Sequence, residues 1–195
     1  MADFVKRNYT FEIRANDEGG AKIVGRPIVY DARFDLGGGW YETIAKGALD
    51  GADLSDVFFF VNHDISKIPL ARAREAFDQS TMRFIVDDAG MVIEVDLDIE
   101  NNADARALYS AVKRGDITGM SFMFSIEAEE RDDAKKRYTI IRIGKVVEVS
   151  AVNFPAYEAT EISARSKEVQ ERTKETVDKA SLELALLKAK ILYNI

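Results

Sequence analysis

The chain has 195 residues, 47% of them hydrophobic and 31% charged, which is typical of one folded domain with an appendage and excludes disordered and fibrous proteins. Acidic residues outnumber basic ones by 34 to 27, for a formal net charge of -7, so a nucleic acid is a poor candidate ligand. The absence of cysteine and the presence of a single histidine exclude disulfides, thiolate nucleophiles and metal sites built from several histidines.

The N-terminal sequence MADFVKR lacks the apolar core of a secretory signal peptide. No later run approaches the roughly 20 apolar residues that a membrane-spanning helix needs. We therefore expect a protein that is neither exported by a signal peptide nor inserted into a membrane.

Short strands separated by turn residues are expected over most of the first 160 residues. They fall at residues 9–14, 22–30, 57–62, 82–86, 91–98, 118–128, 136–143 and 145–153. Two helices interrupt them, a weak one at 41–52 and a better one at 103–114, which Asn102 can cap and Gly115 can end. This pattern predicts a mainly β domain with flanking helices (α+β) over residues 1–165.

The composition changes after residue 165 to charge-dense sequence without glycine or proline. Apolar residues recur there at the spacing of one helical face, at Val169, Val177, Leu184, Leu187 and Ile191. We interpret this C-terminal segment, residues 166–195, as one long helix. Its last turns are rich in apolar residues, so they need to pack on the domain or on another chain.

The sequence VFFFVNH ends in the only histidine, His63. Strand alternation places His63 on the face of Val57 and Phe59, at a turn marked by Asn62 and Asp64. This position suits a general base that is held partly desolvated at the end of a strand. A surface histidine that merely ends a core strand is the competing interpretation.

The sequence TGMSFMFS contains a small hydroxyl among bulky apolar residues. Alternation places Ser121 on the face of Gly119 and opposite to Phe122 and Phe124. A serine nucleophile needs such a rigid strand and an adjacent base, because its own hydroxyl is unreactive at neutral pH. The competing interpretation is a small residue within a sheet.

In the sequence KVVEVSAVNFPAY, Glu148 interrupts a run of valines. A carboxylate on such a strand is costly to bury unless a cationic or hydrogen-bonding group meets it. His63 is one candidate partner, since a carboxylate behind the base orients the imidazole in a catalytic triad. A carboxylate that points to solvent remains the alternative.

The blocks GRPIVYDARFD, WYETIAKGAL, VNHD, RGDITGMSFMF and VVEVSAVNFPAY resemble, in order and spacing, the prohead (capsid maturation) proteases of tailed bacteriophages, of the HK97 type. The resemblance covers residues 25–165. It implies a serine endopeptidase in which Ser121 is the nucleophile and His63 is the general base. Glu148 is the best candidate for the third member, and Asp64 and Glu94 remain open.

The family resembles herpesvirus assemblin distantly, which implies a closed or nearly closed, largely antiparallel β-barrel with helices, although a sandwich fits the strands equally well. The implied substrate is the scaffolding segment of the major capsid protein precursor, cut inside the immature capsid in the host cytoplasm. The protease would also cleave itself, and the charge-dense junction beyond Arg165 with the helix that follows is a natural place for this cleavage or for attachment to the scaffold. The relation to assemblin implies a homodimer or larger assembly. The implied chemistry needs no metal or cofactor, and the charge and hydropathy of the chain predict no nucleic-acid or membrane partner. Backbone amides of residues 153–157 are candidates for the oxyanion hole.

Two other functions remain open from the residues. A non-catalytic capsid assembly protein could retain the protease fold. A small-molecule-binding barrel could use the aromatic residues Phe58, Phe59, Phe60, Phe122 and Phe124, although such residues are more often core. The three glycines at 37–39 lack the Lys-Ser/Thr of a phosphate-binding loop, so we interpret them as a turn.

Overall fold

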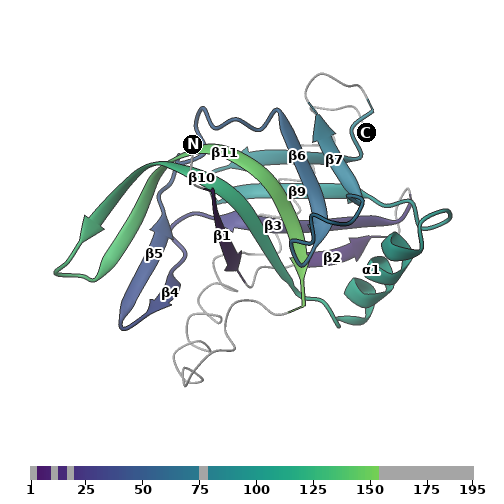
Figure 1. Cartoon of the computed structure of the whole chain (residues 1–195), viewed down its shortest axis with the longest axis horizontal. Coiled ribbons are helices and arrows are strands. Elements are labelled where there is room, and N and C mark those ends of the chain that lie inside the picture. The colour runs from purple at the N-terminus through teal and green to yellow at the C-terminus, as the bar shows by residue number, and fades with distance from the viewer. Residues whose placement is uncertain (1–3, 10–12, 17–19, 75–78, 154–195) are drawn as a thin grey trace.

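The computed structural model describes residues 4–9, 13–16, 20–74 and 79–153. Within them the chain forms eleven strands and one helix (Figure 1). These are β1 (Phe4–Tyr9), β2 (Ile13–Asn16), β3 (Lys22–Val29), β4 (Phe34–Gly37), β5 (Trp40–Ile44), β6 (Asp56–Val61), β7 (Ala71–Arg74), β8 (Met82–Asp87), β9 (Gly90–Asp96), α1 (Ala103–Arg114), β10 (Gly119–Asp132) and β11 (Arg137–Val152).

The larger of two sheets is built around the hairpin of β10 and β11, which are 14 and 16 residues long. Its strand order is β1-β10-β11-β5-β4, and β6 pairs with both β11 and β7. The edge of β11 that does not pair with β10 pairs in parallel with two short strands, one after the other. β5 pairs with residues 137–140 and β6 pairs with residues 148–151. The C-terminal half of β11 therefore lies between β10 and β6. The other end of the hairpin projects beside β4 and β5, at the left of Figure 1.

The smaller sheet is antiparallel, with the order β2-β3-β9-β8. Residues of both sheets and of α1 form one hydrophobic core. Phe59, Phe122 and Phe124 have no exposed surface and belong to this core, so these three aromatic rings serve as core packing and do not line a ligand cavity. The core fixes β6 and β10, the strands that precede or carry the candidate catalytic residues.

Helix α1 spans Ala103–Arg114, as the sequence predicts. The side-chain oxygen of Asn102 accepts hydrogen bonds from the N–H groups of Asp104 (3.0 Å) and Ala105 (3.2 Å), which caps the first turn. Gly115 ends the helix in the left-handed conformation, at φ 79°. No helix in the part of the chain that the structure describes is long and apolar enough to cross a membrane.

The predicted closed or nearly closed antiparallel barrel is wrong. The described strands form two sheets without a ladder between them, and β5 and β6 join the larger sheet in parallel. β7 and β8 approach at a corner, where the N–H of Thr81 donates to the carbonyl of Arg72 at 3.1 Å. Alternating apolar residues identify strands but do not specify which edges pair, so a closed barrel and two open sheets share one pattern.

The weak helix predicted at 41–52 is also wrong. Its first residues belong to β5, whose β-branched Thr43 and Ile44 pair with β11, and turns follow. Gly47 and Gly51 adopt left-handed φ values of 83° and 78°, which a helix cannot continue through. The two strands predicted at 136–143 and 145–153 are one strand, β11. The predicted long C-terminal helix at 166–195 lies outside the described residues.

Candidate active site

Three polar residues share one buried face of the β10–β11 hairpin. Ser121 on β10 lies directly opposite Ser150 on β11, and opposite residues in an antiparallel pair point to the same face. Glu148 precedes Ser150 by two residues, so it shares that face as well. Ser121 and Ser150 have no exposed surface, and Glu148 is 1% exposed. The neighbouring residues Met120 and Phe122 are buried in the hydrophobic core.

His63 reaches this face from a tight turn after β6. Asn62 and His63 both have left-handed backbones, with φ values of 54° and 57°, which is uncommon for residues other than glycine. The N–H of Asn62 donates to the carbonyl of Ala151 (2.9 Å), and its side-chain oxygen accepts the N–H of Asn153 (2.9 Å). The turn is therefore tied to the end of β11 on both sides. This brings His63 to the face that carries Ser121.

The imidazole of His63 lies between a hydroxyl and a carboxylate. Its Nε2 is 2.5 Å from Oγ of Ser121, and its Nδ1 contacts Oε1 of Glu148. An ionised carboxylate only accepts hydrogen bonds, so Glu148 favours the tautomer with the proton on Nδ1. Nε2 is then the acceptor for the hydroxyl proton of Ser121. The His63 side chain is 10% exposed, so these contacts lie in a largely water-excluded site.

Ser150 is a site residue that the sequence analysis missed. Its hydroxyl donates to Oε2 of Glu148 at 2.6 Å, and its oxygen accepts the backbone N–H of His63 at 3.2 Å. It therefore holds the carboxylate and the backbone of the turn at the same time. The sequence feature that could have identified Ser150 is its position two residues after Glu148, because strand alternation places both side chains on one face.

The other carboxylates considered as third members lie elsewhere. Asp64 follows His63 but accepts hydrogen bonds from the hydroxyl (2.5 Å) and N–H (3.1 Å) of Ser66, which lower the pKa of its carboxyl. Glu94 is on β9 in the smaller sheet, where it accepts a hydrogen bond from Nζ of Lys22 at 2.8 Å. Among the described residues, no group of three or more His, Asp or Glu side chains is placed to hold a metal ion.

The predicted oxyanion-hole segment begins at Asn153. Its N–H is already donated to the side chain of Asn62, so it is not available for a substrate oxyanion in this conformation. Residues 154–157, the rest of that prediction, lie outside the described residues.

Comparison with known proteins agrees with the resemblance seen in the sequence. The family model described as caudovirus prohead serine protease matches residues 9–175, which is most of the chain. No curated protein and no solved structure matches the chain, so the resemblance to herpesvirus assemblin has no support from these comparisons. With a serine, a histidine and a carboxylate in contact within the matched range, the chain belongs to the caudovirus prohead serine protease family.

Proposed function

We propose that this chain is an endopeptidase that works through a covalent acyl-enzyme, with Ser121 as nucleophile, His63 as general base and Glu148 as the carboxylate that orients the imidazole. The observation that carries the proposal is the 2.5 Å separation of His63 Nε2 and Ser121 Oγ. Glu148 on the opposite ring nitrogen supports it, because a triad needs this order of hydroxyl, imidazole and carboxylate.

In the first step Oγ of Ser121 attacks the peptide carbonyl while its proton passes to Nε2 of His63. Glu148 stabilises the imidazolium that forms, and Ser150 keeps the second carboxylate oxygen in place. The imidazolium then gives its proton to the leaving amine, which breaks the peptide bond and leaves the acyl group on Ser121. A water molecule attacks this ester as His63 accepts its proton. Return of that proton to Oγ releases the acid product.

The proposed substrate is the scaffolding segment of the major capsid protein precursor, inside the procapsid. The family assignment supports a capsid precursor protein as the substrate class. Self-cleavage is part of the proposal, and we place it in the charge-dense segment that begins beyond Arg165. Intact mass measurement tests self-cleavage. Residues 166–195 still attached after the capsid precursor has been fully processed would contradict it.

A fluorophosphonate probe tests the nucleophile, since the activated hydroxyl displaces fluoride and stays bonded to phosphorus. Intact mass should show one adduct, mapped to Ser121, in the wild type and none in Ser121→Ala or His63→Ala. Ser125→Ala is the matched control, because Ser125 is a buried serine of β10 whose oxygen accepts the N–H of Lys145 (3.0 Å). Ser121 has no exposed surface, so labelling also requires the site to open. Equal labelling of Ser121→Ala would refute the assignment.

A further inference from the structure

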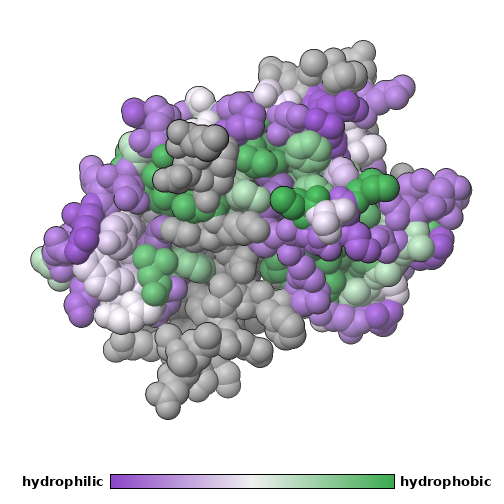
Figure 2. Space-filling model, in the orientation of Figure 1, coloured by the Kyte–Doolittle hydropathy of each residue, from purple (hydrophilic) through white to green (hydrophobic). Residues whose placement is uncertain are grey.

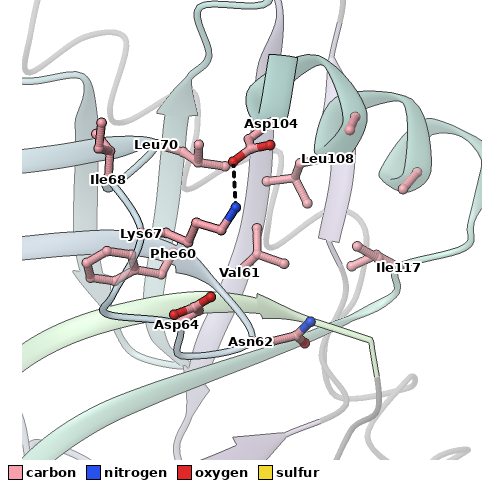
Figure 3. Close-up of a pocket in the computed structure, with 12 residues that line it drawn as sticks. Phe60, Val61, Asn62, Asp64, Lys67, Ile68, Leu70, Asp104, Leu108 and Ile117 are labelled. Atoms are coloured by element: carbon pink, nitrogen blue, oxygen red, sulfur yellow. Dashed lines mark hydrogen bonds and ion pairs between the residues drawn. The ribbon is translucent and has the colours of Figure 1, made fainter. Parts of the chain in front are cut away.

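A pocket of about 390 Å³ opens next to the candidate active site. It lies between helix α1 and the segment of residues 60–70 that ends β6 and leads to β7 (Figure 3). Asn62 and Asp64, the two chain neighbours of His63, both line it. Consecutive Cα atoms are about 3.8 Å apart, so the pocket wall begins one residue from the general base.

The inner part of the pocket is apolar and its rim is charged. Phe60, Leu108 and Ile117 contribute buried side chains to the lining. At the rim, Nζ of Lys67 is 3.5 Å from Oδ2 of Asp104, and both side chains are mostly exposed (Figure 3). An apolar lining with a few polar groups at the edge is the usual construction of a ligand pocket.

The pocket exists because α1 presents small side chains to it. Ala107 and Ala111 lie one helical turn apart and both line the pocket. Each contributes only a methyl group, so the helix leaves space that a leucine at either position would fill. Alanine and leucine are both strong helix formers, so that change does not oppose the helix itself.

Two large apolar side chains are exposed on the segment that follows His63. Ile65 is 69% exposed and Ile68 is 83% exposed, and Ile68 lines the pocket. Figure 2 shows hydrophobic side chains at the surface over β6 and β7, beside hydrophilic ones. Ile68 thus places an exposed apolar side chain at the edge of the pocket, where a ligand can contact it.

We propose that this pocket binds a large apolar side chain, aliphatic or aromatic, of the protein substrate, within about three residues of the scissile bond. The range follows from the pocket's position one residue from His63 and the rise of about 3.3 Å per residue of an extended peptide. Two acidic residues, Asp64 and Asp104, and one basic residue, Lys67, line the pocket, so an acidic side chain is disfavoured there. This inference rests on the proposed function, because it requires Ser121 to cleave peptides.

The experiment uses the full-length protein and a library of peptides from a digested proteome, with the cleaved bonds identified by mass spectrometry. Wild-type cleavages should be enriched in a large apolar residue at one fixed position near the bond. Ala107→Leu should reduce kcat/KM for a peptide with that residue at least tenfold relative to its alanine analogue. Ile68→Ala should weaken the same preference, and it changes an exposed side chain at little risk to folding.

Lys113→Leu is the matched control, because it adds a leucine to an exposed position of α1 that does not line the pocket. It should keep the wild-type preference. Suppose that the wild type labels at Ser121 and cleaves peptides, but that Ala107→Leu and Ile68→Ala leave its side-chain preference unchanged. This result overturns the pocket assignment and leaves the proposed function intact. A wild type that neither labels nor cleaves overturns the proposed function, and the pocket assignment with it.

Discussion

The hydroxyl of Ser150 donates to Oε2 of Glu148 at 2.6 Å while its oxygen accepts the backbone N–H of His63. One side chain thus holds two members of the proposed triad. Ser150→Ala should lower the rate of Ser121 labelling by about 10- to 100-fold, because the carboxylate and the turn lose their shared partner. The measurement is the labelling rate as a function of pH, together with thermal unfolding.

Ser125→Ala is again the comparison for this prediction, since it also removes a buried serine hydroxyl from the same sheet. A positioning role predicts that Ser150→Ala loses far more labelling than Ser125→Ala at a similar loss of stability. Equal losses of labelling in the two variants would mean that Ser150 acts only through stability.

Glu148→Gln tests the carboxylate without changing the size of the side chain. The glutamine amide can donate to Nδ1 of His63, which favours the tautomer that cannot accept the proton of Ser121. We expect a loss of about 10³- to 10⁴-fold in the rate of peptide cleavage, with folding retained. Cleavage assays and unfolding curves measured on the same preparation check this. A loss smaller than tenfold would exclude Glu148 from the triad.

The pH dependence of cleavage should follow the protonation of His63. Only the neutral imidazole can accept the proton of Ser121, so kcat/KM should rise with pH as His63 deprotonates and then level off. The profile is measured between about pH 5 and 9. A flat profile across that range would show that His63 is not the base.

Stability in acid should depend on the ion pair of Arg26 and Asp87, which takes no part in the candidate active site. Arg26 has no exposed surface and makes two hydrogen bonds to Asp87, of 2.6 and 2.8 Å. Burial alone raises the pKa of the Asp87 carboxyl, but hydrogen bonds from Arg26 and the N–H of Ala89 outweigh it, so the pKa is lowered overall. A carboxyl with a lowered pKa in the folded state stabilises the fold above its unfolded pKa of about 3.9 and loses that contribution as the pH falls further.

Asp87→Asn should therefore destabilise the protein by about 3–5 kcal/mol at pH 7, because Arg26 keeps a buried charge without its counter-charge. The difference from the wild type should begin to shrink below about pH 4, where Asp87 of the unfolded chain takes up a proton, and should disappear only below the lower pKa that Asp87 has in the fold. Urea unfolding at several pH values measures both effects. Asp56→Asn, which breaks the more exposed pair with Arg72, should cost much less, and equal costs would contradict the role of burial.

Local signals in the sequence predicted helix α1 well, although they also predicted a helix at 41–52 that is not there. The cap at Asn102 and the glycine at 115 define α1 to the residue, because each acts on its own turn. Glu148 could be matched with His63 from the residues, because a carboxylate within valines needs a partner, and the resemblance to the prohead proteases added Ser121 as the nucleophile. Their mutual contacts agree with that grouping, while their catalytic roles stay predictions.

Features that depend on distant residues were harder to predict. The sequence indicates a turn at Asn62, but it does not indicate that both Asn62 and His63 adopt the left-handed backbone, which contacts of Asn62 to the end of β11 hold in place. The sheet order could not be read from alternation, which is the same for a barrel and for two sheets. The parallel pairing of β11 with two short strands likewise depends on the length of β11, which the sequence pattern divides in two at Gly144.

The placement of β11 between β6 and β10 also affects when the site can exist during synthesis. Glu148 and Ser150 are separated from His63 by 85 and 87 positions and belong to the last described strand. While β11 is still inside the ribosome, the part of the chain that has emerged contains His63 and Ser121. It lacks the strand that lies between β6 and β10 and brings the two residues together. The site is thus assembled late, through long-range pairing that forms slowly. With the proposed triad as the catalytic site, the chain cannot cleave peptides before β11 has folded against β6 and β10.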